Sequence, residues 1–185
     1  MDQYLKLVYR AKHGSVDAFA DLYQEVYEDL YRFAVYTLKD SVDAQDVVSE
    51  TVADAFATIR KLRKEEAFKG WIFKILSAKC KRKLKEYANR ETELSGEQLE
   101  RLAAPNTTMD MAEHVQLRML YWELSVEERM IVALHVFAGY TSREIAKQLH
   151  MNENTVRSKE SRALKKMKEQ LIGTAGKQSG GNCNG

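Results

Sequence analysis

The hydrophobic residues of this chain recur every three or four positions over most of its length, which is the spacing that places them on one face of an α-helix. The longest such run predicts a helix from about Val16 to Leu38, preceded by Gly14 and Ser15, which are typical of a helix start. Its apolar stripe consists of Phe19, Leu22, Tyr23, Val26, Tyr27, Leu30, Tyr31 and Ala34. Such a stripe predicts a helix that packs one face against a core.

The same periodicity predicts two further helices. One runs from about Val42 to Ile59 and follows Asp40 and Ser41, which favour a helix start. Its apolar stripe consists of Val48, Val52, Ala55, Phe56 and Ile59. A polar loop over residues 60–66 leads to the other helix, from about Ala67 to Tyr87. Its apolar stripe consists of Phe68, Ile72, Ile75 and Leu76.

The periodicity stops after the third helix, in a segment that contains Gly96 and the only proline, Pro105. With one proline and 9 glycines in 185 residues, most of the chain outside this segment is expected to be helical. The sequence therefore predicts an all-α fold of two small helical domains joined by a flexible, acidic linker and followed by a disordered, glycine-rich tail. The predicted units are residues 1–88, 89–108, 109–172 and 173–185.

The second domain carries clear helix boundaries. Ser125 with Glu128 and Thr141 with Glu144 both fit the capping box, in which two side chains satisfy each other's backbone amides. Gly139 is expected to end the helix that starts after Ser125. Short helices joined by tight turns predict a helix-turn-helix.

The last predicted helix, capped by Asn152, has two distinct faces. The basic, hydroxyl-rich face consists of Arg157, Ser158, Ser161, Arg162, Lys165 and Lys168. The apolar face consists of Val156, Ala163, Leu164, Met167 and Leu171. We expect the apolar face to pack on the helix over residues 142–149 and to leave the basic face for the DNA major groove, where arginine binds guanine edges and hydroxyls bind bases or phosphates. The plainer interpretation is a solvated amphipathic helix.

Glu160 conflicts with this pattern because it falls in the middle of the apolar face. An unpaired buried carboxylate is costly. We therefore expect Glu160 to extend toward solvent or to pair with a basic side chain such as Arg143 or Lys147.

The net charge of +2 hides a strong segregation of charge along the chain. The balance of basic over acidic residues is −6 over residues 1–56, +9 over 57–85, −5 over 86–113 and +4 over 114–185. Basic segments are expected to bind a polyanion and acidic segments a basic surface, although solvated helix faces also vary in charge without any function.

The +9 segment contains the third predicted helix, which has a second, polar face. That face carries Lys74, Ser77, Lys81 and Lys85, flanked by Lys79, Arg82 and Lys83, with Trp71 at its edge. A basic face beside an aromatic ring suits single-stranded or melting DNA, because cations neutralise phosphates and rings accept unstacked bases. Plain core packing is the simpler interpretation of Trp71, and solvation is the simpler one of the lysines.

No group of residues points to catalysis, to a metal or to another cofactor. The 4 histidines are scattered, and Asp46 and Glu50 share a helix face without a His or Cys beside them. Cys80 and Cys183 lie far apart, which favours a reduced, cytosolic compartment. No apolar run approaches the roughly 20 residues of a membrane span, and residues 1–6 lack the features of a signal peptide. We therefore expect a cytoplasmic, non-enzymatic protein without cofactors or membrane insertion.

Four segments, in order, resemble the sigma-70 family of transcription initiation factors and in particular its small extracytoplasmic-function (ECF) class. They are residues 14–32, 43–51, 68–75 and 124–165. The resemblance implies a C-terminal helix-turn-helix of the winged-helix-like, sigma region 4 type. It also implies a protein that binds core RNA polymerase, directs it to promoter DNA through the −10 and −35 elements, and is held inactive by an anti-sigma factor.

The resemblance further implies roles for three sets of residues. Docking on the clamp helices of the polymerase is implied for Asp43, Gln45, Asp46, Ser49 and Glu50. Recognition and melting of the −10 element is implied for Arg60, Lys61, Arg63, Lys64, Trp71, Lys74, Ser77, Lys81 and Lys85. Recognition of the −35 element is implied for Thr141, Arg143, Thr155, Arg157, Ser158, Ser161, Arg162 and Lys165.

Some positions depart from the family pattern. Gln45 and Ser49 stand where glutamate and glutamine are usual, which weakens the acidic docking face. Arg82 stands where aspartate is common, and its positive charge predicts more contact with phosphates. The alternative function is that of a helix-turn-helix regulator that binds its operator without core polymerase, with the N-terminal half as a sensor or dimerisation module.

Overall fold

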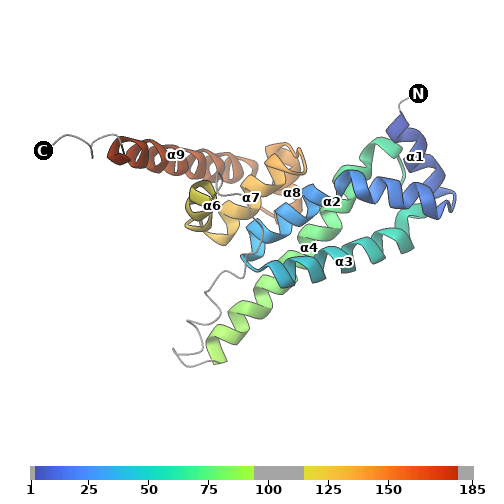
Figure 1. Ribbon diagram of the computed structural model, residues 1–185, viewed down its shortest axis with the longest axis horizontal. Coiled ribbons are helices and arrows are strands. Elements are labelled where there is room, and N and C mark those ends of the chain that lie inside the picture. Colours follow the sequence, from blue (N-terminus) through green and yellow to red (C-terminus); the bar gives the residue numbers. More distant parts are fainter. Residues whose placement is uncertain (1–2, 94–114, 179–185) are drawn as a thin grey trace, which may run out of the picture.

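The structure, a computed structural model, describes residues 3–93 and 115–178, which form helices and turns without a β-strand (Figure 1). The helices are α1 (Gln3–Lys12), α2 (Val16–Leu38), α3 (Ser41–Thr58), α4 (Phe68–Glu93), α6 (Val115–Trp122), α7 (Val126–Val136), α8 (Ser142–Leu149) and α9 (Glu153–Gln178), with the 3-10 turns η1 (Ile59–Lys61) and η2 (Glu65–Ala67). The expected all-α fold is confirmed. Because the described residues contain no strand, the helix-turn-helix has no β wing among them.

The helix α2 has the predicted bounds, and its ends show why. The Ser15 hydroxyl accepts a hydrogen bond from the Ala18 amide at 3.3 Å, which caps the first turn. At the other end, Lys39 adopts a left-handed conformation with φ of 63°, and its amide donates to the Val35 carbonyl. The helix α1 was not predicted from the sequence. It packs on α2 and buries Val8.

The helices α2, α3 and α4 pack on one another around buried aromatic rings. Phe33 on α2 meets Phe73 on α4 edge to face, with ring centroids 5.7 Å apart. The predicted stripe of α3 needs one correction, because Phe56 is 49% exposed and reaches the core only through the edge of Phe19. Thr51 is buried instead, since its hydroxyl donates to a carbonyl one turn earlier and needs no water.

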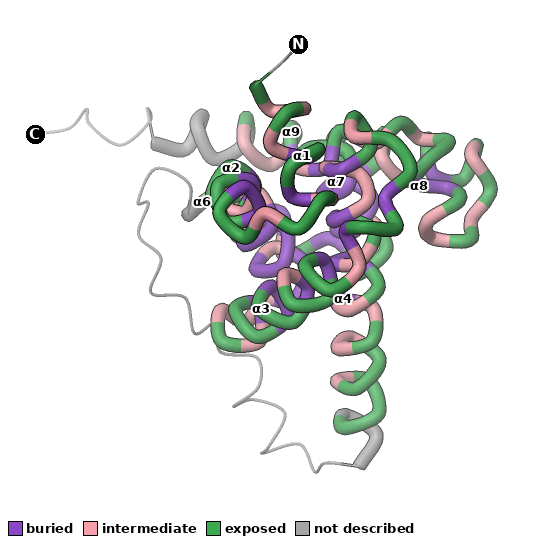
Figure 2. The backbone as a smooth tube through the Cα atoms, turned by 90° about the vertical axis from the view of Figure 1, so that its right-hand side faces the viewer, coloured by how far each residue is buried: buried purple, intermediate pink, exposed green. Residues whose placement is uncertain are grey.

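The helix α4 continues past Tyr87 and ends at Glu93, so its last turns cover the first residues of the predicted linker. These turns contain no glycine or proline, and a helix that has already formed extends through such residues at little cost. Tyr87 still donates a hydrogen bond to Asp43 of α3, whereas residues 88–90 are exposed and α4 extends beyond the other helices there (Figure 2). The remainder of the predicted linker, residues 94–108, lies outside the described residues.

Both predicted capping boxes are present. Ser125 caps α7 and Thr141 caps α8, and each hydroxyl accepts from the amide of the glutamate three residues later at 3.3 Å. Gly139 follows the end of α7 with φ of 69°, which glycine adopts without strain. The side-chain oxygen of Asn152 accepts a hydrogen bond from the Asn154 amide at 2.8 Å and caps α9, as predicted.

The helix α9 is longer than predicted. It continues to Gln178, whereas the disordered tail was expected to begin at Gly173. Glycine lowers helix propensity by about 1 kcal/mol, but it does not require a new nucleation event at the end of a long helix. Residues 179–185 of the predicted tail lie outside the described residues.

The two helical groups, α1–α4 and α6–α9, lie against each other (Figure 1). The helix α2 packs on α6 and α7, and α4 is hydrogen-bonded to α8. The buried residues of both groups form one continuous core cluster. The two predicted domains are therefore closed onto each other in this structure.

Candidate nucleic-acid and protein interfaces

The predicted acidic docking face lies on the outer side of α3. Asp40 caps this helix, since its carboxylate accepts from the Asp43 amide at 2.8 Å. Gln45, Asp46 and Ser49 are exposed on successive turns. Asp46 has no ion pair with any other described residue, so its charge is free to meet a partner.

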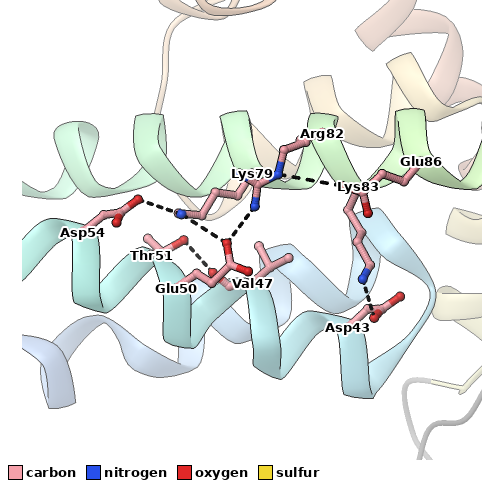
Figure 3. Close-up of polar contacts among 9 residues, drawn as sticks. All are labelled: Asp43, Val47, Glu50, Thr51, Asp54, Lys79, Arg82, Lys83 and Glu86. Carbon is pink, nitrogen blue, oxygen red and sulfur yellow. Dashed lines mark hydrogen bonds and ion pairs between the residues drawn. The ribbon is translucent and has the colours of Figure 1, made fainter.

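The other two carboxylates of the predicted docking face are bound by cations of α4 (Figure 3). Glu50 lies 2.7 Å from Arg82 and 3.2 Å from Lys79, and Lys83 lies 2.9 Å from Asp43. Arg82 was expected to contact phosphates, but here its guanidinium is engaged by Glu50. These pairs join α3 and α4 along their length.

The same contacts shift the pKa values of both carboxyl groups. Hydrogen bonds from Lys79 and Arg82 lower the pKa of Glu50. Burial alone would raise the pKa of Asp43, but hydrogen bonds from Lys83 and Tyr87 outweigh it and the pKa is lowered. Asp43 is thus a charged group held inside the domain, with 23% of its side chain exposed.

The loop between α3 and α4 presents a row of cations. Ile59 and Leu62 are buried and anchor the loop, and an ion pair between Lys12 and Glu65 joins it to α1. The exposed cations are Arg60, Lys61, Arg63 and Lys64. The predicted −10 loop is therefore a fixed, solvent-facing basic surface.

Trp71 lies at the edge of this surface, on the second turn of α4. Its ring is half-buried and tilted against Phe68, with centroids 6.0 Å apart. The indole thus packs on the core, and Trp71 also lines the same hollow as the loop residues Lys61 and Lys64. Lys74 and Lys85 are exposed, as predicted.

The prediction that Ser77 lies on the exposed basic face is wrong. Ser77 is fully buried, because α8 covers this part of α4. The Gln148 side-chain amide donates to the Ser77 hydroxyl at 2.7 Å, and Ser77 donates to the Lys74 carbonyl at 3.2 Å. Lys81 is also engaged, since its ammonium group donates to the Gln148 carbonyl at 3.0 Å.

A groove with a volume of about 1480 Å³ lies between this part of α4 and the helix-turn-helix. Tyr140 and Gly70 both line it, and the Tyr140 hydroxyl donates a hydrogen bond to the Gly70 carbonyl. Its cationic lining residues are Lys61, Arg63, Lys64, Lys69, Lys74, Lys81 and Lys147. Only two acidic residues, Glu66 and Glu144, line it as well. The groove is therefore strongly basic.

The predicted −35 face of α9 is exposed throughout. Its exposed residues are Thr155, Arg157, Ser158, Ser161, Arg162 and Lys165. The opposite face is held by Val156, Ala163 and Met167, which are buried against the rest of the domain. Leu164, predicted for the apolar face, is 49% exposed because it lies at the boundary of the two faces.

Several polar groups of the −35 surface are held in place by local contacts. Arg157 pairs with Glu153 at 2.6 Å, and the Ser158 hydroxyl donates to the Asn154 carbonyl at 2.8 Å. Thr141 is exposed, but its hydroxyl is bound to Glu144 in the capping box. Arg143 is exposed on the first turn of α8.

Glu160 lies beside a basic side chain, as predicted, although the residue is neither of the two examples named. Its carboxylate lies 3.3 Å from Nδ1 of His135 on α7, rather than beside Arg143 or Lys147. Only 15% of the Glu160 side chain is exposed. The side chain faces α7 because the neighbouring apolar residues of α9 also pack on that helix.

Sequence reasoning missed the residues that join the two halves. Tyr36 on α2 meets Tyr121 on α6 edge to face, with centroids 5.0 Å apart, and also contacts Phe137. One signal pointed to such a contact. Gly70 falls within a helical segment, where glycine is unfavourable unless another group approaches the backbone closely, and Tyr140 does so here.

The described residues contain no group of three or more His, Cys, Asp or Glu side chains arranged to hold a metal ion. Within the same residues, none of the helices has the combination of length and apolar character needed to cross a membrane.

Comparisons with known proteins agree with this geometry. Residues 22–90 match the family model for Sigma-70 region 2, and residues 114–167 match the model for Sigma-70, region 4. The chain is 30% identical to the RNA polymerase sigma factor SigV of Bacillus subtilis over 144 residues, which cover 78% of this chain and 85% of SigV. It is 27% identical to the ECF RNA polymerase sigma factor SigM of Mycobacterium tuberculosis over 150 residues, 81% of this chain and 75% of SigM.

The fold is also similar to a solved structure. The sigma factor RpoE from Bartonella quintana, in complex with the anti-sigma factor NepR, superposes with a TM-score of 0.70 at 19% identity, covering 85% of this chain and 98% of that one. The fold, the two matched regions and the similarity to SigV agree: the chain belongs to the sigma-70 family of RNA polymerase sigma factors, in the ECF class, and is a transcription initiation factor rather than an enzyme.

Proposed function

We propose that this sigma factor uses three separate surfaces to bind core RNA polymerase and direct it to promoters. The outer face of α3 docks on core RNA polymerase, the loop before α4 together with α4 engages the −10 element, and the basic face of α9 reads the −35 element. The observation that carries the proposal is the separation of charge, because the unpaired carboxylate of Asp46 on α3, the cations of the loop before α4 and the cations of α9 are exposed on different elements.

The docking contact centres on Asp46, which is exposed and has no ion pair among the described residues. Gln45 and Ser49 flank it and supply hydrogen-bonding groups instead of further charge. A basic helical surface on the polymerase would complement this face. Asp43 stabilises the domain through its ion pair with Lys83, and the ion pairs of Glu50 hold α4 in its orientation.

At the −10 element, the exposed cations of the loop neutralise phosphates of the separating strands. Trp71 offers the edge of an aromatic ring beside them, onto which an unstacked base can pack. Lys74 and Lys85 extend the basic surface along α4. Ser77 and Lys81 reach DNA only when α8 is displaced from α4.

At the −35 element, α9 enters the major groove with its exposed arginines and hydroxyls. Arg157 and Arg162 are positioned to bind base edges, since both are solvent-facing on the N-terminal half of the helix. Arg143 on α8 suits a phosphate of the DNA backbone.

The proposal also assigns the two units of the chain and the compartment in which they act. The polymerase-docking and −10 unit comprises residues 1–88, and the −35 unit comprises residues 109–172, with the acidic linker between them. The factor acts in the cytoplasm, where core polymerase works.

A further partner is also proposed. The similar fold of RpoE has been solved with an anti-sigma factor, and an inhibitor of that kind would find a basic groove between α4 and α8 here.

Run-off transcription tests the proposal. Purified core RNA polymerase is supplied with pooled genomic promoter fragments, with and without this protein. New, defined start sites that depend on the protein are expected, and their upstream sequences supply the −10 and −35 elements. A protein that binds DNA alone and neither binds core enzyme nor starts transcripts would contradict the proposal and favour a helix-turn-helix regulator.

A further inference from the structure

The helix α1 lies at the end of the molecule where α3 passes into α4, beside the loop proposed to engage the −10 element (Figure 1). It packs on both 3-10 turns of that loop, η1 and η2. The residues that match Sigma-70 region 2 are 22–90, so α1 precedes the matched part of the chain. The family match therefore assigns no role to α1, whereas its contacts with the loop point to one.

The two halves of the loop are held in different ways. In the first half, Ile59 and Leu62 are buried, so core packing fixes the backbone there. No residue of the second half, residues 63–67, is buried. Burial in the core therefore does not hold this half, which is tied to α1 by the ion pair between Lys12 and Glu65.

This ion pair is well placed to fix the second half of the loop. Lys12 lies on the last turn of α1 with only 14% of its side chain exposed, and Glu65 is 26% exposed. A partly buried pair is screened by salt much less than a pair in open solvent. The hydrogen bond from Lys12 lowers the pKa of Glu65, as expected for a carboxylate that is bound in its charged form.

The turn that follows α1 also contacts the loop. The Ser15 amide donates to the Arg10 carbonyl at 3.0 Å, and the Gly14 amide donates at 3.1 Å to Ala11. These two bonds form the Schellman pattern, which needs the positive φ of 97° that Gly14 adopts without strain. A Cβ atom at position 14 would lie 3.3 Å from Nη2 of Arg60, so the first cation of the loop rests against this turn.

The helix α1 reaches the aromatic part of the proposed −10 surface as well. The ring of Tyr4 meets Phe68, the first residue of α4, edge to face with centroids 6.3 Å apart. Burial raises the pKa of the Tyr4 hydroxyl to about 12. Phe68 is itself buried and packs on Trp71, with centroids 6.0 Å apart. One helix thus contacts both the loop and the support of the ring proposed to receive a base.

We propose that α1 is a positioning element for −10 recognition: Lys12, through Glu65, holds the loop cations in the orientation in which the loop discriminates between bases. These cations are Arg63 and Lys64, which precede Glu65 and are exposed. The inference rests on the proposed assignment of the loop to the −10 element. If loss of the ion pair reduced the competent loop conformation to about 20% of the population, apparent affinity for the correct −10 sequence would fall about fivefold.

The test uses the full-length protein assembled with core polymerase. Lys12→Met removes the ion pair but keeps a long side chain, and Lys12→Arg keeps the cation and should restore wild-type behaviour. The matched control is Lys6→Met, because Lys6 is an exposed lysine of the same helix and its replacement changes the net charge equally. Thermal unfolding and affinity for core enzyme are measured for each variant and should not differ between the two methionine variants.

The readout is the affinity of each holoenzyme for a fork-junction DNA with the −10 sequence of a mapped promoter, and for the set of its single-base substitutions. Lys12→Met is expected to bind the correct sequence about fivefold more weakly. Substituted sequences that make no specific contact with the loop should lose little, so discrimination shrinks. A loss of stability alone would not change base preference. Equal discrimination by Lys12→Met and Lys6→Met would overturn the inference.

Glu65→Gln separates positioning from simple electrostatics. Removal of a carboxylate near DNA should by itself tighten binding, because it reduces repulsion of phosphates. Positioning predicts the opposite, a loss of discrimination similar to that of Lys12→Met. In the Glu65→Gln background, Lys12→Met should then have no further effect. An equal loss from Lys12→Met in both backgrounds would show that Lys12 binds DNA directly, and would overturn the inference.

Failure of the proposed function is distinguishable in the same assay. Arg63→Ala with Lys64→Ala removes two of the loop cations. If this variant discriminates −10 bases as the wild type does, the loop is not the −10 surface, and the proposed function fails together with the inference. If it loses discrimination while Lys12→Met does not, only the role of α1 is wrong.

Discussion

The guanidinium of Arg82 on α4 lies 2.7 Å from the carboxylate of Glu50 on α3 (Figure 3). This ion pair connects the helix proposed to dock on polymerase with the helix proposed to engage the −10 element. Lys79 and Lys83 add parallel connections to Asp54 and Asp43. The two helices therefore form one unit, so that docking through α3 would also set the orientation of α4 toward DNA.

The exposed carboxylate of Asp46 is expected to contribute to polymerase binding without contributing to stability. Asp46→Arg should weaken binding to core enzyme at least tenfold, about 1.4 kcal/mol, because it places a cation against a basic partner. The thermal midpoint should not change, since Asp46 has no ion pair with the other described residues. Affinity for core polymerase is measured by biolayer interferometry. The matched control is Asp21→Arg on α2, also exposed; equal losses for both variants would contradict the assignment.

Glu50→Arg should behave differently from Asp46→Arg. It is expected to weaken core binding and also to lower the free energy of unfolding by roughly 1 kcal/mol, because two solvent-exposed ion pairs become repulsive contacts. Urea unfolding measures the loss. Unchanged stability would show that the pairs with Lys79 and Arg82 do not hold the helices together in solution.

The carboxylate of Asp43 should stabilise the fold in a pH-dependent manner. Its pKa lies below the ordinary 3.8 in the folded protein, so its contribution is present above 3.8 and is lost as the pH falls through the folded-state pKa. At neutral pH, Asp43→Asn should lower the free energy of unfolding by about 1 kcal/mol, a value typical of a partly screened charged hydrogen bond.

Urea unfolding of wild-type and variant protein at neutral pH, and at successive pH values below 3.8, checks this expectation. The difference between the two proteins should shrink as the pH falls. Asp46→Asn is the control and should show no such trend. A difference that stayed constant into acid would mean that the charge of Asp43 is not what stabilises the fold.

Arg157 on α9 is expected to read a base of the −35 element. Arg157→Ala should lower the affinity for a duplex carrying that element by roughly 1–3 kcal/mol and relax discrimination at one base pair. Binding is measured for the holoenzyme on a set of singly substituted promoters. Arg10→Ala, an exposed arginine on α1, is the control. A uniform loss across all sequences would assign Arg157 to phosphate binding instead.

The contact between Glu160 and His135 should stabilise the C-terminal domain modestly. Glu160→Leu is expected to lower the thermal midpoint, because it removes a pair whose carboxylate is only 15% exposed. A double-mutant cycle with His135→Gln should give a coupling of about 0.5–1 kcal/mol. A gain in stability for Glu160→Leu would show that the carboxylate is not compensated by the histidine.

Much of the local structure could be predicted because it depends on residues close together in the chain. The bounds of α2 follow from its apolar spacing and its Ser15 cap, and both capping boxes of the helix-turn-helix depend on side chains three residues apart. The same locality explains why the exposed face of α9 was predicted correctly. The period of an α-helix fixes which of its residues share a face, whatever the helix later packs against.

Predictions for α4 were less successful because its polar residues contact two helices, α3 and α8, from other parts of the chain. The sequence places Lys79, Arg82 and Lys83 beside a basic face, but the carboxylates that bind them come from α3. It also assigns Ser77 to that face, whereas α8 buries it. Charge and periodicity show which residues share a face, but they do not show what lies opposite.

The sequence by itself thus determined most of the helices and caps, the segregation of charge along the chain and the family to which the chain is similar. Only the tertiary structure decided that the two halves close on each other and that Tyr140 and Gln148 bind α4. The physical reason is the separation along the sequence of the groups that interact. Helix formation and capping act within a few residues, whereas the hydrogen bonds between α4 and the helix-turn-helix join groups 67 to 71 positions apart and depend on how whole helices pack.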